Sequence, residues 1–390
     1  MIMPVSIVGW AHGKFGKSLA ADNEELMFEV VGPALAHAQV QPADIDGIFV
    51  GICNVGFTRQ EFQASLVGMR HPALANVPAT RFENACATGS AALFGAIDFI
   101  EAGRGKVALV VGAEKMTSVS NSEISELLTR GTYMKEEAEI PHGFPGVFAR
   151  VASEYFMRYG DQSDAMAHIA AKNHRNALDN PYAHVQKDLG FEFCATVSSQ
   201  NPYVAAPLRR TDCSPVSDGA VALVIASEDV ANTLPRAISF RSRTQVNDFM
   251  ALSRRDVIEF AGARSAWDAA LKRSKIKLDD LDLVETHDCF TIAELIEYEA
   301  MGLVARGEGR RAILEGWTQK GGKLPVNPSG GLKARGHPIG ATGISMHVMA
   351  AMQLMNEAGG MQVENSELAG VFNMGSAAVT NYVSILERTR

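Results

Sequence analysis

The sequence predicts an α/β protein made of two similar halves, because two short segments of the chain each occur twice and in the same order. Residues 43–50 match residues 279–285, and both copies end in an apolar run. Residues 86–89 match residues 340–343 through a shared Ala-Thr-Gly. The apolar runs predict buried strands, and each Ala-Thr-Gly segment leads into a helical pattern. We therefore expect a duplicated strand-and-helix arrangement.

The segments around these matches complete the pattern of each half. Ala-rich amphipathic stretches at 24–40 and 257–275 predict helices before the first match, and apolar runs at 107–111 and 368–372 predict strands after the second. Each half is expected to run strand, helix, strand, small-residue turn, helix, strand. Two such halves would pair two mixed sheets with helices between and outside them, and the matched helix starts would face one shared site.

The repeat divides the chain into an N-terminal half, 1–235, and a C-terminal half, 236–390. Residues 119–207 break the pattern of the first half and are expected to form an inserted domain. Within it, helices are predicted at about 148–159 and 163–178. A surface excursion is the alternative, but long stretches with their own helices usually have a function.

Length and composition are those of an ordinary globular protein. The 390 residues are 47% hydrophobic and 21% charged, which is enough to bury two or three domain-sized cores. A formal net charge of −8 argues against nucleic-acid binding, which needs a basic surface. No apolar run in the sequence approaches the roughly 20 residues of a membrane span. Residues 1–9 predict a first strand and not a signal peptide, so we expect a cytoplasmic protein.

The cysteines point to a reducing compartment and to one candidate nucleophile. None of the five forms a Cys-x-x-Cys pair, which argues against a disulfide framework or a zinc ribbon. Cys86 lies between small residues just before the apolar, Ala-rich run 91–97, and so at the start of a predicted helix. Unpaired N–H groups and a partial positive charge at a helix start favour thiolate over thiol. A buried core thiol is the alternative for Cys86, and it is the expected role of Cys53.

Three further segments carry chemistry. Residues 330–343 place five glycines around His337, which Pro338 follows, so the imidazole is held in a stiff loop, as a general base must be. Residues 285–290 put polar and titratable side chains between a predicted strand and a predicted helix, where open α/β sheets bind ligands. Residues 370–378 form a strand that ends in a small-residue turn, which can aim backbone N–H groups at a developing oxyanion.

Together these segments resemble the signature loops of the thiolase superfamily, and most closely those of the sterol-carrier-protein-2-type thiolases. The resemblance runs almost from end to end and includes residues 142–146, 173–177 and 180–183. It implies the thiolase fold, in which duplicated βαβαβαββ halves form a five-layered α/β/α/β/α domain. It also implies that the insertion is a loop domain that covers the active site and holds coenzyme A.

The resemblance implies a role for each candidate residue. Cys86 would attack a thioester carbonyl and carry the acyl group, and His337 would take the thiol proton or hold the thiolate as an ion pair. The backbone N–H groups of Cys86 and Gly375 would form one oxyanion hole. His287 and His337 would form a second, for the enolate oxygen of the other thioester. Cys289 would remove the α-proton in condensation or protonate the leaving enolate in thiolysis.

Two positions depart from the commoner thiolase pattern. Most thiolases have Asn-Glu-Ala-Phe where this chain has residues 287–290, and a second catalytic cysteine where it has Asn373. The amide of Asn373 cannot act as an acid or base, and the resemblance to the sterol-carrier-protein-2-type group implies that Cys289 supplies the missing thiol. Lys333, Arg335, Arg209 and Arg210 are candidates for an anion-binding strip, although most are expected to be solvated surface charges.

The sequence predicts an acyl-CoA acyltransferase that cleaves 3-ketoacyl-CoA with coenzyme A or runs the reverse Claisen condensation, in lipid metabolism such as fatty acid β-oxidation. Three alternatives stay open. A ketoacyl synthase would not need the thiol of Cys289. A thiolase-fold lyase, a retro-aldolase of acyl-CoA side chains, would tend to lack the nucleophile Cys86. A non-catalytic acyl-CoA-binding subunit would not need intact loops.

The expected partners follow from the same resemblance. Acyl-CoA and coenzyme A are substrates, and we expect no permanently bound cofactor and no metal. A homodimer or a dimer of dimers is expected, with the strand near 107–112 as the pairing edge. Some similar archaeal and bacterial proteins work with a small zinc-ribbon/OB-fold subunit, which is a possible partner here.

Overall fold

A computed structural model describes residues 4–390 and contains one large mixed sheet. Its strands are β1 (Val5–His12), β2 (Gly47–Gly51), β3 (Ala79–Phe82), β4 (Val107–Glu114), β7 (Gly219–Ser227), β8 (Ile238–Asn247), β9 (Leu283–Glu285), β10 (Leu368–Gly375) and β11 (Thr380–Arg388). They are hydrogen-bonded in the order β3-β2-β4-β7-β1-β8-β11-β10-β9. The first five strands in this order come from the first half of the chain and the last four from the second.

The two halves meet at a narrow joint, and here the structure differs from the expected pair of separate sheets. β1 pairs with β8 only through Ser6 with Ser239 and Ile7 with Ile238, whereas β1 pairs with β7 over most of its length. The second half also has one strand fewer. In place of a counterpart to β3 it has an isolated parallel bridge between Val284 and Val326.

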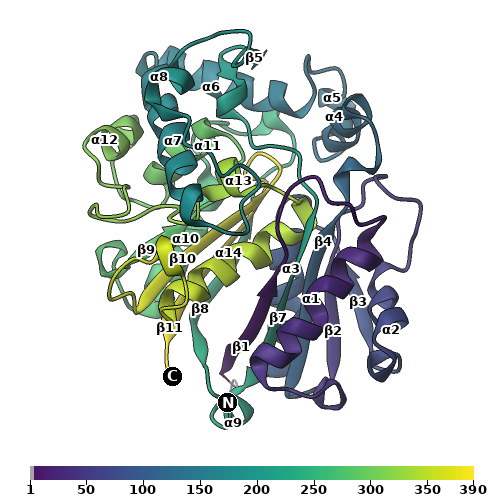
Figure 1. Cartoon of the computed structure of the whole chain (residues 1–390). Helices are drawn as coiled ribbons and strands as arrows, with labels where there is room; N and C mark the ends of the chain where they lie inside the picture. The colour runs from purple at the N-terminus through teal and green to yellow at the C-terminus, as the bar shows by residue number, and fades with distance from the viewer. Residues whose placement is uncertain (1–3) are drawn as a thin grey trace.

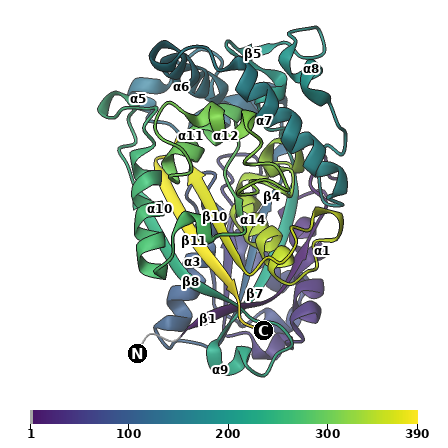
Figure 2. The ribbon, with the colours of Figure 1, turned by 90° about the vertical axis from the view of Figure 1, so that its left-hand side faces the viewer.

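Helices complete five layers, as the thiolase fold predicts (Figures 1 and 2). α3 (Thr88–Glu101) and α14 (Ile339–Leu354) lie side by side between the two halves of the sheet, where α3 contacts β2 and β4, and α14 contacts β4 and β10. α1 (Asn23–Ala38) covers the outer face of β1 and β7, and α10 (Ala261–Ser274) covers β8 and β11. Every residue of α14 is buried, as expected for a helix between two sheets.

The repeated glycines explain why the two central helices can lie so close together. A Cβ atom on Gly89 would lie 2.9 Å from the carbonyl oxygen of Gly340, and one on Gly343 would lie 2.4 Å from the backbone nitrogen of Ser90. Neither distance leaves room for a side chain. The duplicated Ala-Thr-Gly therefore marks the crossing of α3 and α14, and it brings the two helix starts together.

The helical insertion lies over one end of the strands, with the second half's own short helices beside it (Figure 1). The predicted helices within the insertion are present as α6 (Phe144–Tyr159) and α7 (Ser163–Asn176). The remaining helices and the small hairpin are α2 (Leu66–Arg70), α4 (Asn121–Thr129), α5 (Met134–Glu137), α8 (Gly190–Ala195), α9 (Glu228–Ala231), α11 (Thr291–Ala300), α12 (Gly309–Leu314), α13 (Gly331–Arg335), β5 (Tyr203–Ala205) and β6 (Leu208–Arg209).

The expected place of the strand near 107–112 is also wrong. The strand near 107–112 is β4, which lies inside the sheet with β2 on one side and β7 on the other, so its backbone groups are already paired. The edges of the sheet are β3 and β9. The predicted first strand begins at Val5, and Met1–Met3 lie outside the described residues. Within residues 4–390, no helix is both long and apolar enough to cross a membrane.

Candidate active site

Cys86 lies in a strained turn between β3 and α3. The residue before it, Ala85, has φ 49°, in the left-handed region that costs a non-glycine residue about 1 kcal/mol. The hydroxyl of Thr88, in the first turn of α3, accepts a hydrogen bond from the backbone N–H of Asn84 at 2.8 Å, which fixes the turn. Cys86 itself is 7% exposed. The predicted position at a helix start is thus confirmed, because Ala87 is the N-cap of α3.

His337 comes to the same place from the glycine-rich loop between α13 and α14. Its backbone N–H donates to the hydroxyl of Ser217 at 3.3 Å, and its Nδ1 is 2.7 Å from the hydroxyl oxygen of Thr342, one turn into α14. Gly336, directly before it, has φ 111°, which few other residues adopt. The stiffness that the sequence predicts for this loop therefore has two sources, the backbone conformation and the bond to Thr342.

His287 enters from the loop between β9 and α11. It is fully buried, and its Nδ1 is 2.8 Å from the amide nitrogen of Asn373 on β10. Its neighbour Asp288 accepts hydrogen bonds from the backbone N–H groups of Leu332 at 2.6 Å and Lys333 at 3.1 Å. Asp288 therefore connects this loop to the start of α13, the helix that precedes His337. It does not cap α11, whose N-cap is Phe290.

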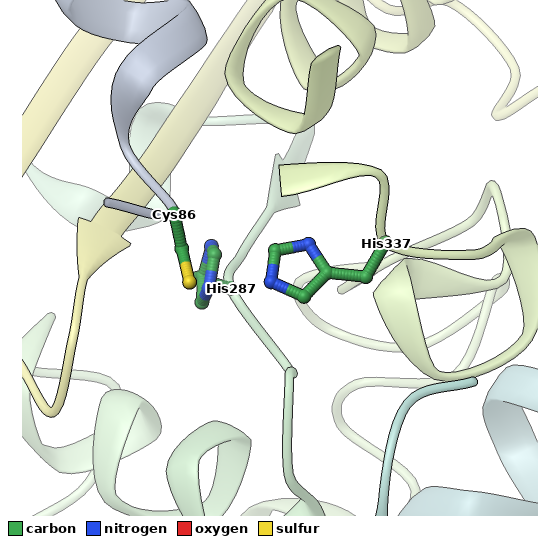
Figure 3. A group of neighbouring side chains, drawn as sticks. All are labelled: Cys86, His287 and His337. Carbon is green, nitrogen blue, oxygen red and sulfur yellow. The ribbon is translucent and has the colours of Figure 1, made fainter. Parts of the chain in front are cut away.

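The three side chains converge from three segments that are far apart in the sequence (Figure 3). The sulfur of Cys86 and a ring nitrogen of each histidine all lie within 4.8 Å of one another. The two imidazoles meet edge to face, with ring centroids 5.1 Å apart. Within residues 4–390, Nε2 of His287 and Nε2 of His337 are both buried and have no hydrogen-bond partner. Both atoms can therefore bond to a substrate.

Burial determines the charge state of this group. It raises the pKa of the Cys86 thiol to about 12, although hydrogen bonds from the backbone amides of Ser376 and Cys86 itself act in the opposite direction. Burial also lowers the pKa of His337 to about 3 and that of His287 well below its usual range. The helix start therefore does not produce a resting thiolate, contrary to the sequence-based expectation. The site holds a neutral thiol beside neutral imidazoles.

Cys289 shares the cavity in front of Cys86. Its side chain is 2% exposed, and burial raises the pKa of its thiol well above the usual range. It lies between His287 and the start of α11, on the same loop. The structure thus brings all four predicted catalytic side chains to one place. The predicted Gly375 ends β10, and the amide that faces the Cys86 sulfur belongs to the next residue, Ser376.

Two small cavities meet at Cys86. The first has a volume of about 140 Å³ and is lined by Cys53, Val55, Glu83, Ala85, Cys86, Leu128, Arg130, Gly131, Phe144, Ile339 and Ser376. The second has a volume of about 110 Å³ and is lined by Cys86, Met116, Leu128, Phe144, Pro145, Cys213, Ser214, Pro215, Val216, Cys289, Phe290, His337 and Ile339. Cys53 is buried, as predicted, but it also faces the first cavity, so it is not only part of the core.

A larger cavity of about 770 Å³ adjoins the second one. The two share Pro145 and residues 213–216, so together they lead from Cys86 toward the insertion. Lys187, Arg210 and Lys333 line the larger cavity, which gives it a basic character. Lys333 is nearly fully buried there, and its burial lowers the pKa of its amine.

The candidate anion-binding residues separate into two pairs. Arg335 and Arg209 are buried in ion pairs, with Glu285 at 3.0 Å and with Asp212 at 2.8 Å. Both guanidinium groups are therefore structural, because a buried guanidinium needs a charged partner. Lys333 and Arg210, which line the large cavity, remain the candidates for a ligand. The expectation that most of these residues are solvated is wrong for Arg209, Arg335 and Lys333, which are at most 4% exposed.

Some functional groups could not be found from the sequence. Glu114, at the end of β4, accepts hydrogen bonds from the backbone N–H groups of Cys53, Asn54 and Gly340, so it ties the start of α14 to the loop after β2. Its burial raises its pKa to about 7. Asn373 donates to both His287 and the carbonyl oxygen of Cys86. No local pattern distinguishes Glu114, and the sequence marks Asn373 only as a departure from the commoner thiolase pattern, since each acts through partners that are distant in sequence.

The chain is similar to known proteins over most of its length. Residues 5–191 match the family described as thiolase, N-terminal domain, and residues 244–388 match the thiolase C-terminal domain-like family. An acetyl-CoA acetyltransferase of Methanothermobacter thermautotrophicus is 36% identical over 98% of this chain and 99% of its own length. One from Methanocaldococcus jannaschii is 34% identical over 99% of both chains. Human sterol carrier protein 2 is 30% identical over 95% of this chain and 70% of its own length.

Solved structures agree on the fold. The Ltp2–ChsH2(DUF35) aldolase superposes with a TM-score of 0.83 over 100% of this chain and 99% of its own, at 21% identity. The acetyl-CoA acetyltransferase of Syntrophomonas wolfei superposes with a TM-score of 0.72 over 100% of both chains, at 18% identity. These neighbours carry different activities on one fold, so the choice between activities depends on the site.

Proposed function

The chain belongs to the thiolase family, and we propose that it is an acyl-CoA acyltransferase that works through an acyl group on Cys86. The reaction is thiolytic cleavage of 3-ketoacyl-CoA, its reverse Claisen condensation, or both. One observation carries the proposal. The sulfur of Cys86 lies within 4.8 Å of two buried histidine nitrogens, next to a cavity that leads toward the insertion.

The first half-reaction transfers an acyl group to Cys86. Because the thiol and His337 are both neutral, Nε2 of His337 takes the thiol proton as the sulfur attacks the carbonyl carbon. In cleavage of a 3-ketoacyl-CoA the bond between C2 and C3 then breaks. The backbone N–H groups of Cys86 and Gly375, with that of Ser376 beside them, stabilise the oxyanion, an effect worth about 3–4 kcal/mol per donor.

The leaving group is an enolate, and it needs a donor for its oxygen and a proton for its carbon. Nε2 of His287 and Nε2 of His337, now protonated, are buried without another hydrogen-bond partner among residues 4–390, so both can donate to that oxygen. Cys289 supplies the proton, since its raised pKa keeps it as a thiol. Coenzyme A then attacks the acyl-Cys86 and gives its thiol proton to Cys289, and His337 returns its proton to the Cys86 sulfur as that sulfur leaves. Condensation follows the same steps in reverse.

Coenzyme A and acyl-CoA are substrates in this proposal, with no permanently bound cofactor. The large cavity can hold the phosphates of coenzyme A, because Lys187, Arg210 and Lys333 line it and phosphates favour basic side chains. Residues 119–207 act as the loop domain that covers Cys86, and the chain divides into halves at 235 and 236. Proline and aromatic residues at the start of α6 close the cavity over the site.

We further propose that the protein is a homodimer or dimer of dimers, that it is cytoplasmic, and that it serves lipid metabolism such as fatty acid β-oxidation. Its sterol carrier protein 2 relatives support the last point. A small zinc-ribbon/OB-fold partner is also proposed, because one structural neighbour is named as a pairing of Ltp2 with ChsH2(DUF35). Size measurement with and without such a subunit tests both assemblies.

The deciding experiment maps acyl adducts. The protein is incubated with acetyl-CoA or acetoacetyl-CoA, and its peptides are analysed by mass spectrometry. We expect an adduct on Cys86 that free coenzyme A removes, and none in Cys86→Ala. Cys53→Ala is the matched control, since Cys53 lines the same cavity and should leave acylation intact. If no acyl-CoA labels Cys86, the lyase and the non-catalytic binding subunit become the better readings.

A further inference from the structure

We propose that Asn373 is a positioning residue that holds His287 permanently as an N–H donor, whereas Thr342 lets His337 alternate between proton acceptor and donor. The two histidines then have distinct tasks at one site. This inference rests on the proposed function for its consequences, but the protonation pattern itself follows from the hydrogen bonds around the rings.

The orientation of the Asn373 amide is determined by its neighbours. Its Oδ1 accepts from the hydroxyl of Ser90 at 2.7 Å, and its Nδ2 lies 3.2 Å from the backbone carbonyl oxygen of Cys86. A carbonyl oxygen can only accept, so the group that faces it must be the NH₂. Reversing the amide would place two acceptors against each other in a fully buried position.

This orientation determines the tautomer of His287. The same Nδ2 lies 2.8 Å from Nδ1 of His287, and an amide nitrogen donates but does not accept. Nδ1 must therefore carry the lone pair. Since burial keeps the ring neutral and a neutral imidazole has one N–H, the proton lies on Nε2. That atom is buried and has no hydrogen-bond partner among residues 4–390, in a ring with a nitrogen within 4.8 Å of the Cys86 sulfur, so His287 presents a donor to a substrate oxygen.

His337 is held by a different kind of group. The hydroxyl of Thr342 donates to the carbonyl oxygen of Pro338 at 2.9 Å, and it therefore accepts from Nδ1 of His337 at 2.7 Å. Nε2 is then a free base, as removal of the Cys86 proton requires. Because Thr342 accepts from Nδ1–H, the ring keeps that proton while Nε2 takes the Cys86 proton, and the imidazolium can later return it from Nε2. Thr342 thus lets His337 carry a proton on both ring nitrogens, whereas the NH₂ of Asn373 keeps Nδ1 of His287 without one.

The fixed tautomer also bears on metal binding. The three atoms of Cys86, His287 and His337 lie close enough together to hold a metal ion. A histidine binds a metal through a nitrogen that carries a lone pair, and at His287 Nε2 carries a proton instead. Asn373 therefore keeps this trio in its acid–base role.

Neutron diffraction of deuterium-exchanged crystals of the unmodified protein tests the protonation pattern directly. We expect deuterium on Nε2 of His287 and on Nδ1 of His337. His347 and His12 serve as internal references, because their Nδ1 atoms face carbonyl oxygens of Gly343 at 2.7 Å and Gly13 at 2.6 Å and must carry deuterium. Deuterium on Nδ1 of His287 would overturn the inference. This measurement does not depend on activity, so it separates the inference from the proposed function.

Variants at position 373 test whether turnover depends on the fixed N–H donor of His287. In Asn373→Asp the carboxylate accepts from Nδ1 of His287, so Nε2 loses its proton and the enolate donor is lost. We expect turnover to fall about 10²- to 10³-fold at alkaline pH, as when one oxyanion donor is removed, and to recover partly at acidic pH, where the ring gains a second proton. Asn373→Leu is the matched control, with a loss that does not depend on pH. Equal pH profiles for the Asp and Leu variants would contradict the assignment.

Thr342 offers a second comparison on the other histidine. Thr342→Val removes the hydroxyl at nearly constant volume and should slow acylation of Cys86, whereas Thr342→Ser keeps the hydroxyl and should restore it. Crystals of Thr342→Val should still show deuterium on Nε2 of His287. A Thr342→Val variant that acylates at the rate of Thr342→Ser would contradict the role of the hydroxyl.

Discussion

The cavities at Cys86 predict the length of acyl chain that the protein accepts. Phe144, the first residue of α6, lines both the cavity of about 140 Å³ and the one of about 110 Å³. An apolar cavity of about 150 Å³ holds a benzene molecule, so each cavity fits an acyl group of roughly six carbons or fewer. Phe144→Ala removes the ring between them and should join the two spaces.

The magnitude follows from apolar burial. Each methylene moved from water into an apolar cavity contributes about 0.8 kcal/mol, or roughly a fourfold gain in kcat/KM, until the cavity is full. We therefore expect kcat/KM of the unmodified protein to rise from C2 acyl groups to about C6 and then to fall. In Phe144→Ala the rise should continue past that length, and the gain for short chains should shrink because the larger cavity is only partly filled.

The assay is steady-state cleavage of a series of 3-ketoacyl-CoA substrates that differ by two carbons. Phe99→Ala is the matched control, because it truncates the same side chain at the far end of α3, outside both cavities. It should lower the melting temperature without moving the optimum. An optimum that Phe144→Ala leaves in place, in a folded variant, would show that these cavities do not hold the acyl chain.

Three further predictions concern the two thiols of the site and the crossing of α3 and α14. Cys289→Ala should still become acylated on Cys86, but its exchange of the α-proton of acetyl-CoA with deuterated water should slow by at least about 10²-fold, the usual size of a general acid–base contribution. Exchange at the wild-type rate would show that Cys289 is not the acid or base. The rate of alkylation of Cys86 by iodoacetamide should rise about tenfold per pH unit between pH 7 and 10, because a thiol with a pKa raised to about 12 forms its reactive thiolate only as pH rises. A plateau below pH 9 would mean that the helix start lowers the thiol pKa more than burial raises it. Gly343→Ala should lower thermal stability by about 1–3 kcal/mol or more, since its Cβ would lie 2.4 Å from the backbone nitrogen of Ser90; an unchanged melting temperature would contradict the close helix crossing.

Much of the site could be predicted from local pattern. Cys86 and His287 occupy strand-to-helix junctions that hydrophobic periodicity locates, and glycine spacing marks the stiff loop of His337. The duplicated Ala-Thr-Gly even indicates that two helix starts meet. These features depend on residues that are neighbours in sequence, so a single sequence contains them.

Other features required partners from distant segments. The sequence could not show that Arg335 and Arg209 are used up in buried ion pairs, because Glu285 lies fifty positions from Arg335 and the pairing depends on how β9 meets α13. Nor could it place β4 inside the sheet, since strand order depends on which edges remain unpaired after the whole chain folds. Asn373 looked inert as a catalytic group, and its partners Ser90 and His287 lie on other elements.

The chain by itself determined which chemical groups are present and which loop each one occupies, because backbone preference and hydrophobic period act over a few residues. Tertiary structure decided their protonation. Position at the start of α3 favours a thiolate at Cys86, yet burial among the loop after β2, the start of α14 and the insertion raises its pKa to about 12. Desolvation depends on everything that packs around a group, and so does the choice of tautomer at His287 and His337. The physical reason is the same in both cases: charge responds to the whole surroundings, and the surroundings exist only in the folded protein.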